Sequence, residues 1–127
     1  MTDVNTFISE QQHNENLASQ LSMSPQTLAQ LYEYGVTSSQ SLKLEYFFYT
    51  DAQSKALSLS DSLVRLGYTS EFGQLEDEPG IFLITGWSTP TRAASDKINE
   101  WTALMCSLSF KHDCEFDGWG TNPEQQP

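Results

Sequence analysis

Hydrophobic and polar residues follow two periods along this chain, and the pattern predicts six consecutive elements. A β-prone run starts at Lys43 and ends at Thr50-Asp51, a pair able to cap a following helix. The next apolar residues are spaced by four and three, which predicts a helix that lies on a sheet and ends at Gly67. These apolar positions are Ala52, Ala56, Leu59, Leu63 and Leu66.

The second half of the pattern predicts a β-hairpin, a longer helix and a last strand. Side chains of residues 68–75 alternate between the two faces of a predicted strand, and residues 80–87 form an apolar second strand. Between the two strands, Glu76, Asp77 and Glu78 form an acidic tip. Ser88-Thr89-Pro90 predicts the start of the second helix, with an apolar face of Ala94, Ile98, Trp101, Met105 and Leu108. In the last strand, one face carries His112, Cys114 and Phe116, and the other carries Asp113, Glu115 and Asp117.

The order β-α-β-β-α-β predicts an α+β, ferredoxin-like domain over residues 43–121. Its four-stranded antiparallel sheet would carry both helices on one face. Residues 1–42 are polar and acidic and contain no Lys or Arg, which predicts a helical, loosely attached extension. Within it, Ser24-Pro25 has the pattern of a helix start and Gly35 that of a helix end. Residues 122–127 would form a short tail.

The length and the apolar segments of the chain indicate one soluble domain. With 127 residues and 38% hydrophobic content, it can bury one core. The longest apolar run, residues 81–84, is too short to cross a bilayer, and residues 1–5 lack the basic and apolar regions of an export signal. We therefore expect a cytoplasmic protein, with Cys106 and Cys114 as free thiols.

Charge is the most informative property of the composition. The sequence has 17 Asp and Glu residues against 6 Lys and Arg residues, a net charge of −11. Such a surface repels nucleic acids and anionic membranes, because both are bound largely through cationic side chains. It is compatible with a basic protein partner, although acidity that only keeps the protein soluble would give the same number.

Candidate catalytic and metal-binding residues are few and poorly arranged. His112, Cys114 and Cys106 could supply zinc ligands, but the sequence has no close pair of the CxxC type, so we expect no metal and no cofactor. A Cys–His nucleophile would lack an electropositive setting, and carboxylate pairs such as Asp113 and Glu115 arise by chance in so acidic a chain. No phosphate-binding or nucleophile-elbow motif is present. The sequence thus favours a protein that is not an enzyme.

The aromatic run of residues 46–49 raises the question of RNA binding. A ferredoxin-like sheet can stack bases on its aromatic residues, but the carboxylates expected on the last strand oppose this. The same surface suits an Arg- and Lys-rich protein segment, because carboxylates bind guanidinium groups and aromatic rings accept cations. The candidate partner-binding residues are Glu76, Asp77, Glu78, Asp113, Glu115, Asp117 and Trp119, the last of which could equally be structural.

Three segments resemble the family of the regulator of ribonuclease E activity B. They are the short helix that closes with Gly35, the Leu66-Gly67-Tyr68 step and the Asp-Gly-Trp-Gly-Thr run of residues 117–121. The resemblance implies a ferredoxin-like protein that binds the scaffold portion of ribonuclease E and inhibits RNA processing without catalysis. A generic adaptor or immunity-like module with another partner is the alternative. Well-known family members continue into a long acidic tail, whereas this sequence ends at Pro127, so we expect weaker or different binding if that tail contributes.

Overall fold

The computed structural model describes residues 6–124, which form three helices and six strands. The helices are α1 (Glu10–Glu33), α2 (Gln53–Arg65) and α3 (Ser95–Lys111). The strands are β1 (Ser41–Leu42), β2 (Glu45–Thr50), β3 (Glu71–Gln74), β4 (Phe82–Trp87), β5 (Thr91–Arg92) and β6 (Glu115–Gly120). Residues 1–5, on which the expected lack of an export signal rests, and residues 125–127 of the tail lie outside the described part.

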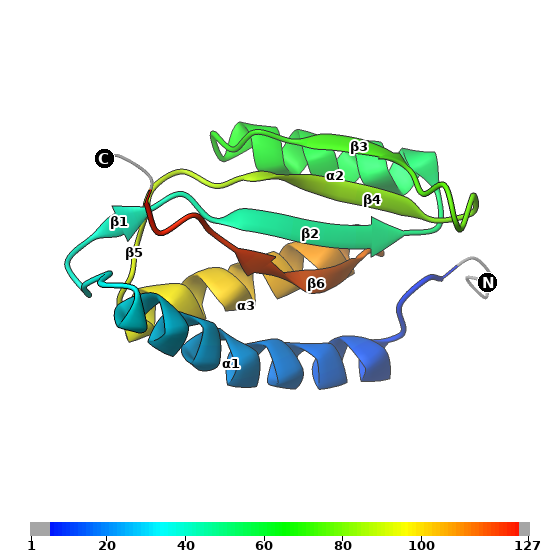
Figure 1. Cartoon of the computed structure of the whole chain (residues 1–127). Coiled ribbons are helices and arrows are strands. Elements are labelled where there is room, and N and C mark those ends of the chain that lie inside the picture. The colour runs from blue at the N-terminus through cyan, green and yellow to red at the C-terminus, as the bar shows by residue number, and fades with distance from the viewer. Residues whose placement is uncertain (1–5, 125–127) are drawn as a thin grey trace.

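Four strands form one antiparallel sheet in the order β3-β4-β2-β6. Helices α2 and α3 lie behind this sheet in Figure 1, and α1 runs beside α3, below β6. The predicted mixed α+β protein with a four-stranded antiparallel sheet is therefore confirmed. The predicted list of elements was incomplete, because β1 and β5 pair in a second, two-stranded sheet.

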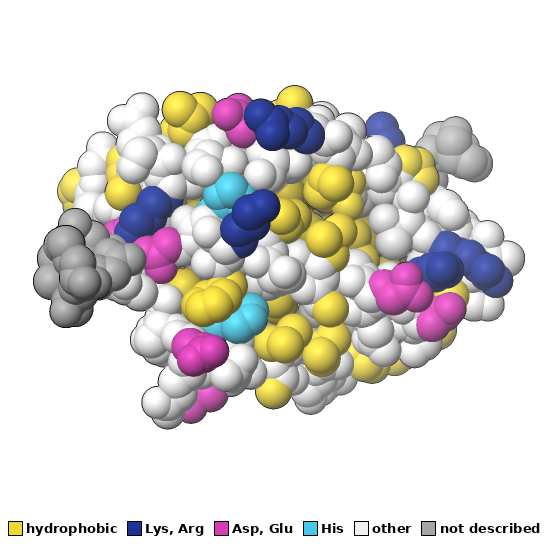
Figure 2. Space-filling view, turned by 180° about the vertical axis from the view of Figure 1, so that it is seen from behind, with side chains coloured by type: hydrophobic (Ala, Val, Ile, Leu, Met, Phe, Trp, Pro, Cys, Tyr) yellow, Lys and Arg dark blue, Asp and Glu magenta, His cyan; other side chains and the backbone are white. Residues whose placement is uncertain are grey.

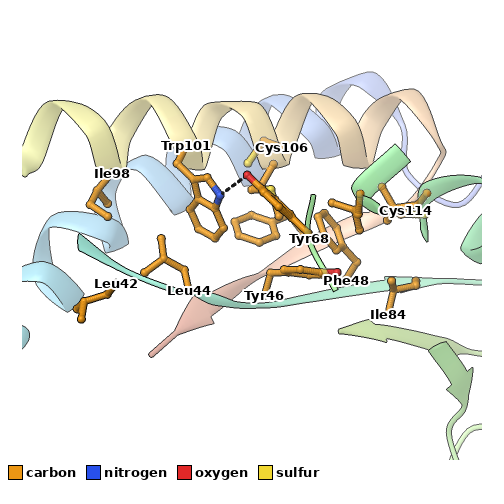
Figure 3. Packing of buried hydrophobic residues seen from close by; sticks show 14 of the residues in the cluster. Leu42, Leu44, Tyr46, Phe48, Tyr68, Ile84, Ile98, Trp101, Cys106 and Cys114 are labelled. Atoms are coloured by element: carbon orange, nitrogen blue, oxygen red, sulfur yellow. Dashed lines mark hydrogen bonds between the residues drawn. The ribbon is translucent and has the colours of Figure 1, made fainter. Parts of the chain in front are cut away.

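The core lies between the sheet and the helices, and the alternation within β2 explains how it forms. Tyr46 and Phe48 point toward the helices and are completely buried. Figure 3 shows Trp101 of α3 above them, with its indole N–H donating to the Tyr68 hydroxyl over 3.1 Å. Burial of the aromatic side chains drives this packing, and the hydrogen bond satisfies the polar atom that is buried with the indole ring.

Helix α1 differs from the prediction at its start. It begins after Ser9, whose side chain accepts from the backbone N–H of Gln12, while the Gln12 side chain accepts from Ser9 in return. Pro25, expected in the first turn, lies inside the helix. An internal proline costs roughly 3 kcal/mol, and tertiary contacts offset it here: Ser24 is buried and its hydroxyl lies 2.7 Å from that of Thr102 on α3.

The expectation that the N-terminal extension is loosely attached is wrong. Leu28 and Leu31 of α1 belong to the common core. The amide groups of Asn16 and Gln20 both donate to the backbone carbonyl of Phe116, over 2.9 and 3.4 Å. Because β6 is at the edge of the sheet, these side chains satisfy a backbone group that would otherwise stay unpaired. The polar composition of α1 thus reflects its packing against a sheet edge.

Two of the predicted helix starts are also wrong, whereas the predicted ends are confirmed. Helix α2 begins after Ala52, because the Thr50 hydroxyl donates to the carbonyl of Asp113 instead of capping the helix. Ser88-Thr89-Pro90 leads into β5, and α3 begins only after Ala94. Gly35 and Gly67 follow the last turns of α1 and α2 with φ of +97° and +89°, the left-handed backbone that favours glycine.

The last strand starts later than predicted. His112 is the C-cap of α3, and Asp113 follows in a left-handed conformation with φ of 56°. The alternating faces expected from residue 112 therefore apply only from Cys114 onward, with Cys114 and Phe116 buried. A register shift opposite Phe47 and Phe48 further displaces the end of β6, including Trp119.

Candidate protein-binding surface

The seven predicted partner-binding residues fall in four separate places. Glu76–Glu78 are exposed in the turn between β3 and β4. Asp113 lies in the turn before β6, Glu115 and Asp117 lie on the sheet face that the helices leave uncovered, and Trp119 lies on the opposite face. The structure does not bring these residues into one site.

Trp119 has the contacts of a structural residue at the edge of a cleft. It is paired with Tyr46 in the sheet and points toward the helices. Its indole N–H donates to the Ser24 hydroxyl over 3.0 Å, and its ring meets that of Trp101 edge-on with centroids 6.0 Å apart. The outer part of Trp119 lines an open cleft of about 720 Å³ between α1 and residues 120–124.

Asp113 is held by contacts within the protein. Its carboxylate accepts from the backbone N–H groups of Phe7 and Ile8 over 2.7 and 2.9 Å, and from the Lys55 ammonium over 2.6 Å. Burial opposes ionisation of this carboxyl, but Lys55 and the two N–H groups outweigh burial and lower its pKa. This residue therefore joins the segment before α1 to α2 and β6.

The uncovered face of the sheet, called the outer face below, carries aromatic and aliphatic side chains. Because Tyr46 and Phe48 point inward, Phe47 and Tyr49 of the same strand point outward. In the neighbouring strand, Thr85 is paired with Phe47 and Leu83 with Tyr49, and Trp87 follows on the same face. The apolar residues of this face are Phe47, Tyr49, Leu83 and Trp87, all partly exposed.

The charged side chains of the four main strands are all acidic. Glu45, Glu71, Glu115 and Asp117 are the ionised residues of β2, β3 and β6, and the four strands contain no Lys or Arg. Pairing places Glu45, Glu71 and Glu115 on the outer face, around the apolar residues. Asp117 is the exposed, unpaired residue at the register shift of β6, and it follows the inward-pointing Phe116 and so lies on the same outer face. Sequence reasoning found Glu115 and Asp117 but missed Glu45 and Glu71, because only the strand order brings β2 and β3 beside the same face.

Glu115 and Asp117 carry charge that the protein leaves uncompensated. Burial raises the pKa of Glu115 and, to a lesser degree, the charge of Asp117 raises it further. Burial alone raises the pKa of Asp117. Ion pairs within the described residues involve other carboxylates, namely Asp51, Asp113 and Glu100. A cation supplied by another molecule would relieve this unfavourable electrostatic energy.

We expect Glu115→Gln to raise the free energy of unfolding at pH 7, because it removes a charge that the fold disfavours. The gain should be only a few tenths of a kcal/mol, because solvent screens a group this exposed. A raised folded-state pKa stabilises the fold below the usual value of 4.5, and this contribution is lost as pH rises through the folded-state pKa. Urea unfolding at pH 7 and at pH 4 measures the effect, and the gain should be absent at pH 4. Glu78→Gln, at the exposed tip, is the control for net charge; an equal gain there would contradict the local explanation.

A hollow on the outer face gives it a defined shape. It has a volume of about 330 Å³ and is lined in part by Glu71, Gly73, Leu83 and Thr85. Gly73 leaves open space above the sheet, since a methyl group there would meet no atom within 4 Å. The Thr85 hydroxyl at its base is buried and has no hydrogen-bond partner among the residues that the structure describes.

The residues considered for other chemistry do not form a reactive site. Burial raises the pKa of the Cys106 thiol to about 11 and that of Cys114 to about 12, so neither is a ready nucleophile. The ring of His112 bonds to the hydroxyls of Ser58 and Ser62 on α2. Within residues 6–124, no group of three or more His, Cys, Asp or Glu side chains is placed to hold a metal ion. Over the same residues, no helix is long and apolar enough to cross a membrane.

The fold and its surface define a small α+β protein with an uncovered, acidic and aromatic sheet face. The family model described as regulator of ribonuclease activity B matches residues 22–121. The chain therefore belongs to this family of regulatory, non-catalytic proteins, and the predicted family is confirmed. A comparison with curated proteins found no match.

Proposed function

We propose that this protein binds ribonuclease E on its scaffold portion, by protein–protein contact, and inhibits RNA processing. The observation that carries the proposal is the family match over residues 22–121, because the family is described by its regulation of ribonuclease activity. The excess of acidic residues supports a basic protein partner and opposes direct contact with RNA. An RNA-processing partner also places the action of this protein in the cytoplasm.

The proposal includes a ferredoxin-like arrangement of the main sheet. Two observations support it: α2 joins β2 to β3 with β4 between them, and α3 joins β4 to β6 with β2 between them. Two interleaved β-α-β units of this kind leave one sheet face free when both helices lie on the other. The free face is then available to a partner.

The test is direct binding of the purified protein to the scaffold portion of ribonuclease E from the same source. Calorimetry measures the affinity at low and at high salt. We expect binding that weakens by about tenfold at high salt, because electrostatic attraction between acidic and basic surfaces is screened. In a parallel assay, the protein should slow cleavage of an RNA substrate by ribonuclease E.

Single-stranded RNA alone is the control ligand, and it should not bind at either salt concentration. Absence of binding to ribonuclease E at both concentrations would refute the proposed partner and favour an adaptor with a different one. Binding without an effect on cleavage would refute inhibition while retaining the partner.

A further inference from the structure

We propose that the outer face of the sheet is the surface on which this protein binds an Arg- and Lys-rich segment of its protein partner. This inference rests on the proposed function and adds the surface and the chemistry of the segment to it. The face consists of Phe47, Tyr49, Leu83 and Trp87 with Glu45, Glu71, Glu115 and Asp117 around them.

The first support is that this face is apolar at its centre and uncovered. The helices α2 and α3 lie on the other side of the sheet, and no helix crosses the face turned toward the viewer in Figure 1. Successive side chains of β2 point to opposite faces of the sheet, so the burial of Tyr46 and Phe48 does not decide what lies outside. A sheet face that contacts only water usually carries polar residues. Here β2 places Phe47 and Tyr49 on the outer face, beside Leu83. Contiguous, partly exposed apolar and aromatic residues rimmed by polar ones are typical of interaction surfaces.

The second support is that the Lys and Arg residues of the protein lie away from this face. Four of the 6 Lys and Arg residues belong to the helices, namely Lys55 and Arg65 of α2 and Lys97 and Lys111 of α3. Figure 2 shows Lys and Arg side chains spread over the helix side. The charged residues of the four main strands are all acidic, so the outer face has charge complementary to a basic segment.

The combination of rings and carboxylates selects the kind of cation that fits. Guanidinium groups stack on aromatic rings and donate bidentate hydrogen bonds to carboxylates, and the alkyl stems of Arg and Lys cover apolar surface. Tyr49 is paired with Glu115 in the sheet, and Glu45 with Trp87, so each ring has a carboxylate beside it.

The charge of the face disfavours two other occupants. A second copy of the chain would bring the same four carboxylates against these four, and like charges at an interface cost several kcal/mol. RNA could stack on Phe47 and Trp87, but its phosphates would meet the acidic rim with no Lys or Arg from the four main strands to bind them. The basic protein segment is the occupant that satisfies both the rings and the carboxylates.

The first experiment follows the tryptophan indole N–H signals of the wild-type protein by NMR. Trp101 donates to Tyr68 and Trp119 to Ser24 on the helix side, whereas Trp87 lies on the outer face. We add either the scaffold portion of ribonuclease E or a synthetic peptide of Arg-Gly repeats. Trp87 should shift with both ligands while the other two signals stay in place. The spectrum of Trp87→Phe assigns the signal.

The second experiment compares two double variants by calorimetry against the ribonuclease E scaffold portion. Phe47→Ala/Tyr49→Ala removes the centre of the outer face, and we expect at least about tenfold weaker binding. Leu57→Ala/Leu104→Ala removes the same number of apolar side chains from the helix side, where Leu57 is 53% and Leu104 is 40% exposed. This control should bind within about twofold of the wild type. Circular dichroism and urea unfolding establish that both variants are folded.

Each outcome separates this inference from the proposed function. If the wild type binds ribonuclease E but Trp87 does not shift, or the helix-side variant is the one that loses binding, the outer face is the wrong surface and the proposed function stands. If ribonuclease E does not bind while the Arg-Gly peptide still shifts Trp87, the surface stands with another basic partner. A shift of Trp87 by single-stranded RNA in place of the peptide would overturn the protein segment as occupant.

Discussion

Replacing Gly86 by alanine is expected to lower the free energy of unfolding by about 3 to 5 kcal/mol, a large share of the stability of a small domain. Gly86 is paired with Tyr46, whose hydroxyl donates to the carbonyl of Thr69 across the glycine. A methyl group at Gly86 would lie 2.1 Å from the Thr69 oxygen and 2.6 Å from the Tyr46 hydroxyl. The first of these contacts is with backbone, so β4 and the segment before β3 must move apart.

Urea unfolding followed by circular dichroism measures this loss, and Gly73→Ala in the adjacent strand is the matched control. An added methyl group at Gly73 meets no atom within 4 Å, so its effect should stay within about 0.5 kcal/mol. Adding Tyr46→Phe to Gly86→Ala should recover only part of the loss, because the clash with the Thr69 carbonyl remains. A loss below about 1 kcal/mol for Gly86→Ala would mean that the hairpin adapts without strain.

The role of Gly86 illustrates what the pattern of a sequence contains. The alternation of β2 and the apolar run of β4 were visible in the sequence, and so was the acidic turn between β3 and β4. The pairing of Gly86 with Tyr46 was not, because it joins residues 40 apart through the register of two strands. Strand alternation predicts which residues share a face of one strand, whereas register decides which side chains meet across strands.

The candidate site was predictable to the same extent. The acids of β6 and the aromatic residues of β2 were recognisable from their own segments, and four of them, Phe47, Tyr49, Glu115 and Asp117, do lie on the outer face. Asp113 was grouped with Glu115 by alternation, but the left-handed turn at Asp113 delays the start of the strand. Its partners Phe7 and Ile8 are more than 100 residues away, a distance over which no local pattern carries information.

The second large effect on stability is expected at Asp113. Replacing Asp113 by alanine is expected to destabilise the fold by about 3 kcal/mol, because it leaves the N–H groups of Phe7 and Ile8 without their acceptor and removes one of the carboxylates that Lys55 contacts. Alanine also adopts the left-handed backbone of this position poorly. Asp113→Gly separates the two causes, since glycine removes the carboxylate without the backbone strain and should cost about 1 kcal/mol less.

The pH dependence of Asp113→Asn gives an independent check of the carboxylate's role. Because the folded-state pKa of Asp113 is lowered, its contribution is complete above the usual value of 3.8 and is lost as pH falls through the folded-state pKa. The difference in unfolding free energy between wild type and Asp113→Asn should therefore be largest at neutral pH and shrink below about pH 4. A difference that stays constant down to pH 3 would rule out the ionised carboxylate as the cause.

The same variant separates the structural carboxylate of Asp113 from the proposed partner-binding carboxylate of Asp117, four residues away. Asparagine tolerates the left-handed turn and keeps the shape of the side chain, so the outer face of Asp113→Asn should remain intact. We expect its affinity for the ribonuclease E scaffold portion to stay within about threefold of the wild type, whereas Asp117→Asn should lose affinity without loss of stability. Calorimetric binding and urea unfolding on both variants decide the matter. If Asp113→Asn lost affinity while fully folded, the binding surface would have to extend around the end of the sheet to this turn.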